Sequence, residues 1–279
     1  MTTILDVLKK GALFLEQKGL PEARLNMEIM VAHELQLKRM ELYLRFEQPL
    51  SEEQLTSLRE KLKQRGQRIP LQHITGTVAF GNYEFRSDAR ALIPRPETEE
   101  LVDLIKKQTF NKPARILDVG CGSGVLGLTL TKDLGQDCSD LTLVDLSPEA
   151  LSLTRENADL LEVEATFLES DLFSNVEGTF DLIVANLPYI AESERENLEP
   201  EVQHDPAMAL YSGSDGLDLL RIFCSQCADY LNPEGAVALE VGYDQGEIVT
   251  EFLNQAGLNQ VSLHADLNGI LRFPIAHKR

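Results

Sequence analysis

Residues 114–124 read ARILDVGCGSG, an apolar run followed by alternating glycines. The apolar run predicts a buried strand over Ala114–Val119, and the residues that follow predict a helix over Val125–Lys132. Glycines between the two elements permit a tight turn and let a ligand lie against the backbone, because no Cβ stands in the way. The stretch therefore predicts a strand–loop–helix unit with a ligand-binding loop.

Strand and helix patterns alternate from about residue 97 onward. The further expected strands are Leu141–Val144, Ala165–Leu168, Phe180–Val184, Ala236–Val241, Val261–His264 and Ile270–Ile275. The further expected helices are Pro148–Ala158, Leu217–Leu231 and Glu247–Ala256. This alternation predicts an α/β fold, with a doubly wound, mostly parallel sheet and an antiparallel element at its end. Ligands of such sheets bind beyond the carboxyl ends of the strands.

The first part of the chain predicts only helices. Apolar residues recur at helical spacing from Ile4 to Leu15, and Ser51–Gln54 is a capping box that opens a helix toward Gly66. Apolar residues then flank Gly81-Asn82, a dipeptide typical of hairpin turns. We expect three parts: a small all-helical domain over 1–73, a β-hairpin linker over 74–96 and the α/β domain over 97–279.

Composition and charge exclude several classes of protein. The chain has 26 Lys and Arg against 45 Asp and Glu; residues 1–80 carry a net charge of +2 and residues 81–279 one of −21. This balance argues against a protein that wraps nucleic acid, because neutralising phosphates takes clustered Lys and Arg. We find no apolar run that could span a membrane and no secretory signal, so we expect a cytoplasmic protein. Cys224-x-x-Cys227 has zinc-like spacing but no second pair, which favours packed thiols and no metal site.

Asp145 follows the second expected strand, 21 residues after Gly124. A carboxylate there can accept hydrogen bonds from ribose hydroxyls of a nucleoside cofactor. A dinucleotide pattern, G-x-G-x-x-G, is present as Gly122, Gly124 and Gly127, but its first glycine comes two residues after the strand. The run Gly120-x-Gly122-x-Gly124 sits directly on the strand end and resembles the S-adenosylmethionine loop of Rossmann-like methyltransferases. The sequence favours that cofactor over a dinucleotide or a purely structural turn.

Asp171 follows the third expected strand. Its carboxylate can accept a hydrogen bond from an adenine amino group, and Leu172 can pack on the ring. A helix N-cap is the alternative interpretation of Asp171. Cys121 has no histidine near it in the sequence, which favours a small loop residue over a nucleophile.

The fourth expected strand runs into Asn186-Leu187-Pro188-Tyr189. The Asn186 side-chain carbonyl and the Leu187 backbone carbonyl are two acceptors that can hold both hydrogens of a planar NH₂ group. Pro188 restricts the loop, and Tyr189 offers an aromatic face to the planar group. An amide or amino nitrogen is a poor nucleophile, and accepting both hydrogens favours the positive charge that develops as it attacks. The segment predicts methylation of such a group; a Pro-containing turn with a packed tyrosine is the alternative.

Over nearly its full length, the chain resembles the bacterial release-factor glutamine methyltransferases, the PrmC/HemK family. The motifs that carry the resemblance are the glycine loop, His73–Gly76, Leu92–Glu99, Asn186–Tyr189, Asp215–Asp218, Leu239–Gly242 and Gln245–Glu247. The segment Pro94–Glu99, which reads PRPETE, resembles the release-factor enzymes rather than the related enzymes that methylate a ribosomal protein. Opening the helix that follows is a second interpretation of its threonine and acids.

The resemblance implies a class I, Rossmann-like methyltransferase domain that uses S-adenosylmethionine, preceded by a substrate-recognition domain over 1–73. It implies methyl transfer to the glutamine amide in the Gly-Gly-Gln motif of class 1 peptide chain release factors, which modulates translation termination. The methyl donor would be held by Gly120, Cys121, Gly122, Ser123, Gly124, Asp145, Asp171, Leu172 and Asn186. The substrate would be held by Asn186, Leu187, Pro188 and Tyr189, with Asn186, Pro188 and Tyr189 as the catalytic residues.

Two positions depart from the family pattern. The family usually has Asn-Pro-Pro-Tyr, and Leu187 replaces its first proline, which keeps the carbonyl acceptor in a less rigid loop. Many relatives carry an aromatic residue at Leu172, which implies weaker adenine stacking here. Methylation of a ribosomal-protein glutamine or of DNA adenine is an alternative with the same chemistry, although the acidic charge disfavours DNA. A nicotinamide-dependent oxidoreductase is a further alternative, without a clear residue pair for hydride transfer.

Overall fold

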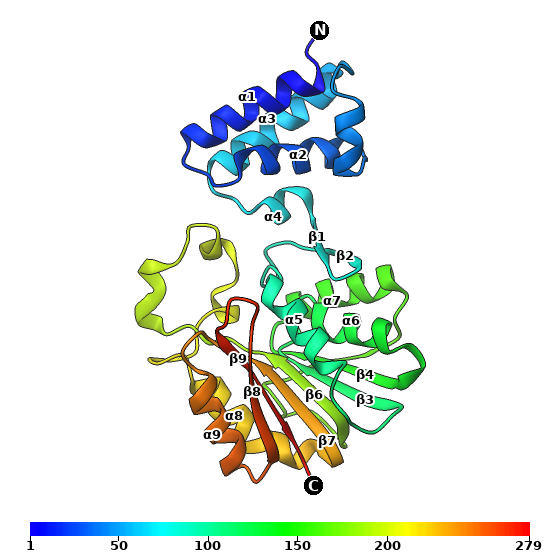
Figure 1. The fold of residues 1–279 in the computed structure, drawn as a ribbon, viewed down its shortest axis with the longest axis vertical. Coiled ribbons are helices and arrows are strands. Elements are labelled where there is room, and N and C mark those ends of the chain that lie inside the picture. Colours follow the sequence, from blue (N-terminus) through cyan, green and yellow to red (C-terminus); the bar gives the residue numbers. More distant parts are fainter. The chain divides into compact units, whose positions relative to one another are not determined.

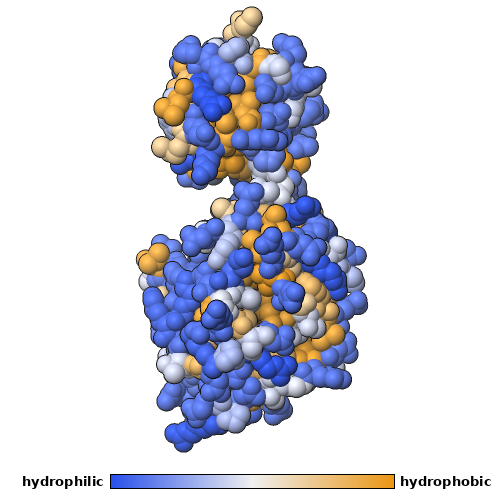
Figure 2. Space-filling view, turned by 90° about the vertical axis from the view of Figure 1, so that its right-hand side faces the viewer, coloured by the Kyte–Doolittle hydropathy of each residue, from blue (hydrophilic) through white to orange (hydrophobic).

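The computed structural model describes all residues from 1 to 279 (Figure 1). The chain forms two compact units: Met1–Thr77 with Glu199–His204, and Val78–Leu198 with Asp205–Arg279. On the face shown in Figure 2, hydrophilic residues cover most of each unit, with apolar patches between them. None of the helices is both long and apolar enough to cross a membrane.

The first unit is a small assembly of helices. Its elements are α1 (Ile4–Gln17), α2 (Ala23–Glu34), the 3-10 helix η1 (Arg39–Leu44), α3 (Glu52–Gly66) and α4 (Leu71–Thr75). Thr3 and Ser51 open α1 and α3 through capping boxes, in which each side chain accepts a hydrogen bond from a backbone amide three residues on. Buried side chains such as Leu8, Met27 and Leu58 form the core of this unit, as the helical spacing predicts.

The short segment Glu199–His204 also belongs to the first unit. Glu201 accepts a hydrogen bond from Arg65 Nη2 at 3.0 Å and forms an ion pair with Arg68 Nε at 3.2 Å. Arg65 is buried and also donates from Nε to Asn26 Oδ1 at 2.7 Å. Because a buried charge is stable only when it is paired and hydrogen-bonded, Glu201 is part of the structure of this unit.

The second unit is built on a seven-stranded sheet. In chain order the strands are β3 (Ala114–Val119), β4 (Cys138–Asp145), β5 (Thr166–Glu169), β6 (Phe180–Asn186), β7 (Leu231–Glu240), β8 (Asn259–Ala265) and β9 (Leu271–His277). Their order across the sheet is β5-β4-β3-β6-β7-β9-β8. The last strand, β9, runs antiparallel to β7 and β8, and all other neighbours are parallel.

Helices cover both faces of this sheet (Figure 1). They are α5 (Pro96–Ile105), α6 (Val125–Leu134), α7 (Pro148–Leu161), α8 (Asp218–Cys227) and α9 (Gly246–Gln255). The first three contribute to one apolar core and the last two to another. Cys224 and Cys227 are buried in the second core, where burial raises the pKa of both thiols, as expected of packed cysteines.

A two-stranded hairpin precedes the sheet in sequence. Its strands are β1 (Thr77–Phe80) and β2 (Tyr83–Arg86), on either side of the expected Gly81-Asn82 turn. Phe80 and Phe85 are buried in the first core with their rings edge to face, the centroids 6.1 Å apart. The hairpin thus contributes its apolar side to the core of the α/β unit.

The structure confirms the fold class: a doubly wound, mostly parallel sheet with an antiparallel last strand, preceded by helices. The helix expected over Leu217–Leu231 was wrong at its end, because α8 stops at Cys227 and Leu231 opens β7. Leu231 falls four residues after Cys227, so the helical apolar spacing runs on into the strand. Helix α4 and the 3-10 turns η3 (Glu192–Asn197), η4 (Val202–His204) and η5 (Ala207–Ala209) were not predicted.

The order of the sheet reverses at β3. Strands β4 and β5 lie on one side of it, and β6 and the later strands lie on the other. A crevice beyond the carboxyl ends at such a reversal is where doubly wound sheets bind ligands. Because β3 ends at Val119 and β6 at Asn186, the glycine loop and the Asn186 segment both begin at this crevice.

Candidate functional site

The loop after β3 is shaped by three glycines in the left-handed region. Their φ angles are +72° at Gly120, +57° at Gly122 and +82° at Gly124. A Cβ on Gly120 would also lie 2.8 Å from Leu187 Cδ2, closer than real side chains approach. The alternating glycines are therefore required by the backbone, and they let this loop lie against the Asn186 segment.

Neighbouring elements hold the glycine loop through its own backbone groups. The amides of its first two residues donate to the carbonyl oxygen of Val144 in β4. Two side chains of α7 bind loop carbonyls: Thr154 Oγ1 donates to Gly122 O at 2.6 Å, and Asn157 Nδ2 donates to Ser123 O at 2.9 Å. These bonds fix the loop before any ligand is present, which limits the ordering entropy that binding must overcome.

Asp145 lies at the end of β4 and lines the same pocket. Its Oδ2 accepts a hydrogen bond from the Gly122 amide at 2.8 Å, and its Oδ1 accepts one from the Ser147 amide at 2.9 Å. Burial raises the pKa of this carboxyl group, and the backbone amides oppose that shift. Each oxygen keeps a further lone pair, so the carboxylate can still accept from the hydroxyl groups of a ligand.

Two buried titratable groups lie beneath the glycine loop. Asp118 Oδ2 accepts a hydrogen bond from the Gly127 amide at 2.9 Å, and burial raises the pKa of this carboxyl group to about 7. Cys121 is buried, and burial raises the pKa of its thiol well above the ordinary value. A thiol held in its neutral form is a poor nucleophile, which agrees with the interpretation of Cys121 as a loop residue.

Asp171 and Leu172 form a further part of the pocket wall. No helix begins at Asp171; a turn follows it, and Leu172 has a φ of +47°. The exposed Asp171 carboxylate has no hydrogen-bonding partner in the protein, whereas the Leu172 side chain is buried. The N-cap interpretation is therefore wrong, and the carboxylate is free to accept from a ligand.

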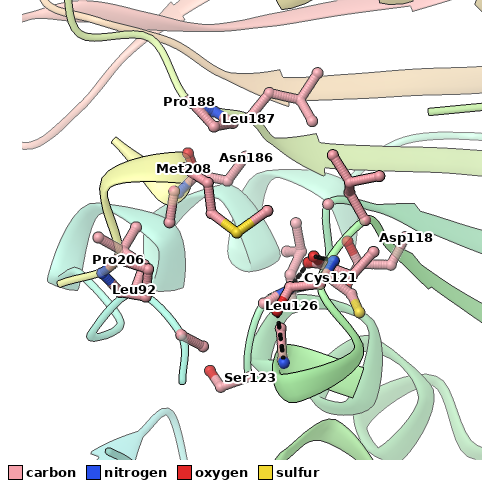
Figure 3. A pocket seen from close by; sticks show the side chains of 18 of the residues that line it. Leu92, Asp118, Cys121, Ser123, Leu126, Asn186, Leu187, Pro188, Pro206 and Met208 are labelled. Atoms are coloured by element: carbon pink, nitrogen blue, oxygen red, sulfur yellow. Dashed lines mark hydrogen bonds between the residues drawn. The ribbon is translucent and has the colours of Figure 1, made fainter. Parts of the chain in front are cut away.

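Asn186, Leu187 and Pro188 line the pocket opposite the glycine loop (Figure 3). Asn186 Nδ2 donates to Thr98 Oγ1 at 3.3 Å, while Asn186 Oδ1 is buried and has no hydrogen-bond partner. The Leu187 carbonyl also accepts no hydrogen bond within the protein. A buried acceptor without a partner is rare in native proteins, and here it adjoins a pocket that could hold a donor.

Tyr189 follows this segment but does not line the pocket. Gln245 Nε2 donates to the Tyr189 carbonyl at 2.9 Å, and a Cβ on Gly216 would lie 2.2 Å from that carbonyl oxygen. Burial and, to a smaller extent, the nearby Glu240 raise the pKa of the Tyr189 hydroxyl to about 12. The structure therefore brings three of the four residues of the segment to the pocket and packs the fourth behind it.

Glu240 is a site residue to which sequence reasoning gave no role, and Thr98 is one for which it considered only the opening of the helix that follows. Thr98 lies in the first turn of α5, and its Oγ1 donates to Glu240 Oε2 at 2.6 Å. Glu240 ends β7 beside Asn186 in the register of β6 and β7. Both residues lie in motifs that carried the family resemblance. The sequence therefore indicated these motifs but not that the two side chains are in contact.

Asp205 is a second contributor that the sequence did not indicate. Its carboxylate accepts from the Ile93 amide at 3.3 Å and pairs with Arg95 Nη2 at 3.0 Å. Just after it, Pro206 and Met208 add apolar surface to the pocket (Figure 3). This buried ion pair ties one wall of the pocket to the PRPETE segment.

Comparison with known protein families assigns the chain. Residues 6–76 match the family model described as PrmC N-terminal domain, and residues 96–215 match the one described as Methyltransferase small domain. A protein of Deinococcus radiodurans called "Release factor glutamine methyltransferase" is 39% identical over 98% of both chains. The chain belongs to the release factor glutamine methyltransferase family. A family member from Geobacter sulfurreducens is 37% identical over 97% of this chain and 95% of its own length.

Solved structures support the fold of this family member. A ribosomal protein L11 methylase from Lactobacillus delbrueckii aligns with a TM-score of 0.51 at 22% identity, covering 72% of this chain and 90% of that one. A 16S rRNA N2 G1207 methyltransferase from T. thermophilus, in complex with AdoMet and guanosine, aligns with a TM-score of 0.52 at 17% identity. That alignment covers 73% of this chain and 50% of the other. At such identities the likeness concerns the methyltransferase fold alone.

Proposed function

We propose that this protein transfers a methyl group from S-adenosylmethionine to the glutamine side-chain amide in the Gly-Gly-Gln motif of class 1 peptide chain release factors. The observation that carries the proposal is the unpartnered acceptor Asn186 Oδ1 at a pocket shared with the glycine loop. The names of the relatives support release factors as the substrate class. The unoccupied acceptor supports a planar NH₂ group as the chemical target.

The residues of the pocket fit S-adenosylmethionine. The preorganised loop Gly120–Gly124 offers close backbone approach, and the carboxylates of Asp145 and Asp171 can accept from ribose hydroxyls and the adenine amino group. Leu172 is buried and presents an aliphatic rather than an aromatic surface to the adenine. When bound, this donor supplies an electrophilic methyl group on a positively charged sulfur.

Asn186 Oδ1 and the Leu187 carbonyl would each accept one hydrogen of the substrate NH₂ group. Their hydrogen bonds strengthen as positive charge develops on the attacking nitrogen, so they stabilise the transition state more than the ground state. Holding both hydrogens also orients the nitrogen lone pair toward the incoming methyl carbon. Pro188 restricts the chain beside these two acceptors.

No strong base is needed before attack. The amide nitrogen loses a proton readily once it has gained the methyl group, because it is then a protonated amide. Burial keeps the Tyr189 hydroxyl protonated, with its pKa raised to about 12, so it would not act as that base. The proton therefore leaves to water, and Tyr189 packs against the apolar core outside the pocket rather than taking part in proton transfer.

The helical domain over 1–73 is proposed as the part that recognises the release factor. It carries exposed apolar side chains on η1, with Met40 at 68% and Leu44 at 87% exposure. Replacing both by Ser should raise the KM for the release factor and leave the KM for S-adenosylmethionine unchanged. Because release factors act in translation, the proposed reaction takes place in the cytoplasm and involves no direct contact with nucleic acid.

The test is incubation with methyl-labelled S-adenosylmethionine and purified release factors, followed by mapping of the labelled peptide. The expected result is label on the glutamine of the Gly-Gly-Gln motif, incorporated about a hundredfold or more slowly with Asn186→Ala. Ribosomal proteins and duplex DNA are incubated in parallel. Label on either of these and none on the release factor would overturn the proposal.

A further inference from the structure

The side chain of Asn186 can point either end of its amide into the pocket. A half-turn of this amide exchanges the carbonyl oxygen, which accepts, for the NH₂ group, which only donates. In the structure Nδ2 donates to Thr98 Oγ1 at 3.3 Å, and a hydrogen bond with Asn186 lowers the pKa of Glu240. The NH₂ end of the Asn186 amide therefore faces Thr98, and Oδ1 is the atom without a partner.

Thr98 and Glu240 determine which end of the Asn186 amide faces the pocket. An ionised Glu240 can only accept, so in that form the Thr98 hydroxyl hydrogen is committed to Glu240 Oε2, 2.6 Å away. The hydroxyl oxygen of Thr98 then has only lone pairs to offer Asn186, and it can bind Nδ2 but not Oδ1. All three side chains come from separate elements, at the start of α5 and the ends of β6 and β7.

We propose that Thr98 and Glu240 are positioning residues, which hold Asn186 with its carbonyl oxygen toward the substrate amide. The proposal rests on the proposed function, because only a substrate NH₂ group needs an acceptor at this place. With the amide reversed, two NH₂ groups would face each other and the charge developing on the substrate nitrogen would meet a donor. When Glu240 is ionised, its negative charge further strengthens Oδ1 as an acceptor through the hydrogen bond with Thr98.

Thr98→Val and Thr98→Ser separate this role from packing. Valine keeps the shape of threonine and loses the hydroxyl, whereas serine keeps the hydroxyl and loses a methyl group. Thr98→Val should lower kcat by about tenfold to a hundredfold, the usual range for a residue that orients a reacting group, with an unchanged KM for S-adenosylmethionine. Thr98→Ser should keep kcat within about threefold of the wild type.

Thr129→Val is a matched control. Thr129 is a buried threonine of α6 whose hydroxyl has no hydrogen-bond partner, and it does not line the pocket. This variant should retain the kcat of the wild type. If Thr98→Ser loses as much activity as Thr98→Val, or if Thr98→Val retains full activity, the positioning role is overturned.

A second measurement does not depend on the substrate. The side-chain NH₂ signal of Asn186 in an ¹⁵N NMR spectrum is assigned by its absence in Asn186→Ala, and its hydrogen exchange is then measured. Exchange should be slow in the wild type and Thr98→Ser and markedly faster in Thr98→Val; equal exchange in all three overturns the proposal. A wild type that methylates no release factor, with faster exchange in Thr98→Val, refutes the proposed function and leaves the positioning role supported.

Discussion

The glycine loop and the Asn186 segment face the same pocket but are held in different ways. The loop is fixed mainly through its backbone, by Val144 of the next strand and by two side chains of α7. The side-chain amide of Asn186 is fixed by the side chain of Thr98, which is bonded in turn to Glu240. These two residues lie 88 and 54 residues from Asn186 in the sequence. The glycine loop is thus held by side chains that follow it by 32 and 34 residues, and Asn186 by side chains that lie farther away in the sequence.

This difference separates two tasks of the site. The wall formed by the glycine loop can bind the methyl donor through carboxylates and through close approach of its backbone. Its carboxylates need only accept hydrogen bonds. The wall formed by the Asn186 segment must present a hydrogen-bond acceptor to the reacting nitrogen. The orientation of the Asn186 side-chain amide decides whether its oxygen or its NH₂ group faces that nitrogen. Changes on the first wall should therefore act on cofactor affinity, and changes on the second on turnover.

Asn186→Ala should have the largest effect on this comparison. It removes one of two acceptors for the substrate NH₂ group, and interactions of this kind contribute roughly 2.7–4 kcal/mol to transition-state stabilisation. We expect kcat to fall by about a hundredfold or more, with unchanged thermal unfolding. Steady-state kinetics and calorimetry check this, and near-normal turnover would contradict the assignment of Asn186 to catalysis.

A buried carboxyl group lies behind each wall, Asp118 behind the glycine loop and Glu240 behind the Asn186 segment. Both groups should make the free energy of unfolding depend on pH in the same way. Burial is the main cause that raises the pKa of Asp118 and of Glu240 to about 7; for Glu240, Arg272 opposes and Glu97 adds to the shift. Tyr189 also lies within its electrostatic reach. A raised pKa means that the folded protein holds the proton more tightly, so the contribution to stability is largest at low pH and is lost as the pH rises to about 7.

Asp118→Asn and Glu240→Gln remove these titrations. Relative to either variant, the wild type should lose about 2–3 kcal/mol of unfolding free energy between about pH 5 and pH 8, at 1.36 kcal/mol per pKa unit. Denaturant unfolding across this range measures the difference. If the gap between wild type and variant stays constant with pH, the carboxyl group in question does not titrate as the structure indicates.

Asp145→Ala tests the cofactor wall. The change removes a charged acceptor of the Gly122 amide and of ligand hydroxyls, and hydrogen bonds to charged groups contribute about 1.5–3 kcal/mol each. The dissociation constant for S-adenosylmethionine should rise by about tenfold or more, while kcat at saturating cofactor changes by less than about threefold. A variant with normal affinity and strongly reduced kcat would reverse the division of tasks between the two walls.

Salt concentration should have the smallest effect on activity, and it should act on the encounter with the substrate rather than on either wall of the pocket. Residues 81–279 carry a net charge of −21, which attracts a basic partner over the roughly 8–10 Å that screening allows near physiological salt. Raising the salt concentration should lower kcat/KM several-fold for a whole release factor and much less for a short, uncharged Gly-Gly-Gln peptide. Equal salt dependence for both substrates would show that the acidic charge lies away from the docking surface.

The two walls also differ in how far the sequence predicts them. The strand, the glycine loop and the acid Asp145 follow one another along the chain, so local pattern and turn chemistry were sufficient. Thr98 lines the pocket and binds Glu240, and Asp205 binds the Ile93 amide. These contacts arise only through the packing of α5, β7 and a long loop, and no local pattern states them. The boundary between α8 and β7 failed for a related reason, because apolar spacing alone does not mark where a helix gives way to a strand.

The position of β9 has a consequence for how the protein is made. Leu271–His277 is synthesised after β7 and β8, yet it lies between them and pairs with both. Until these residues emerge, β7 and β8 each present an unpaired edge, the kind of edge that promotes aggregation. The seven-stranded sheet is therefore complete only after translation has passed His277, whereas the helices before residue 77 have all of their own sequence early, apart from Glu199–His204. A chain that ended before Leu271 would contain all residues that line the pocket and would still lack the strand that joins β7 to β8.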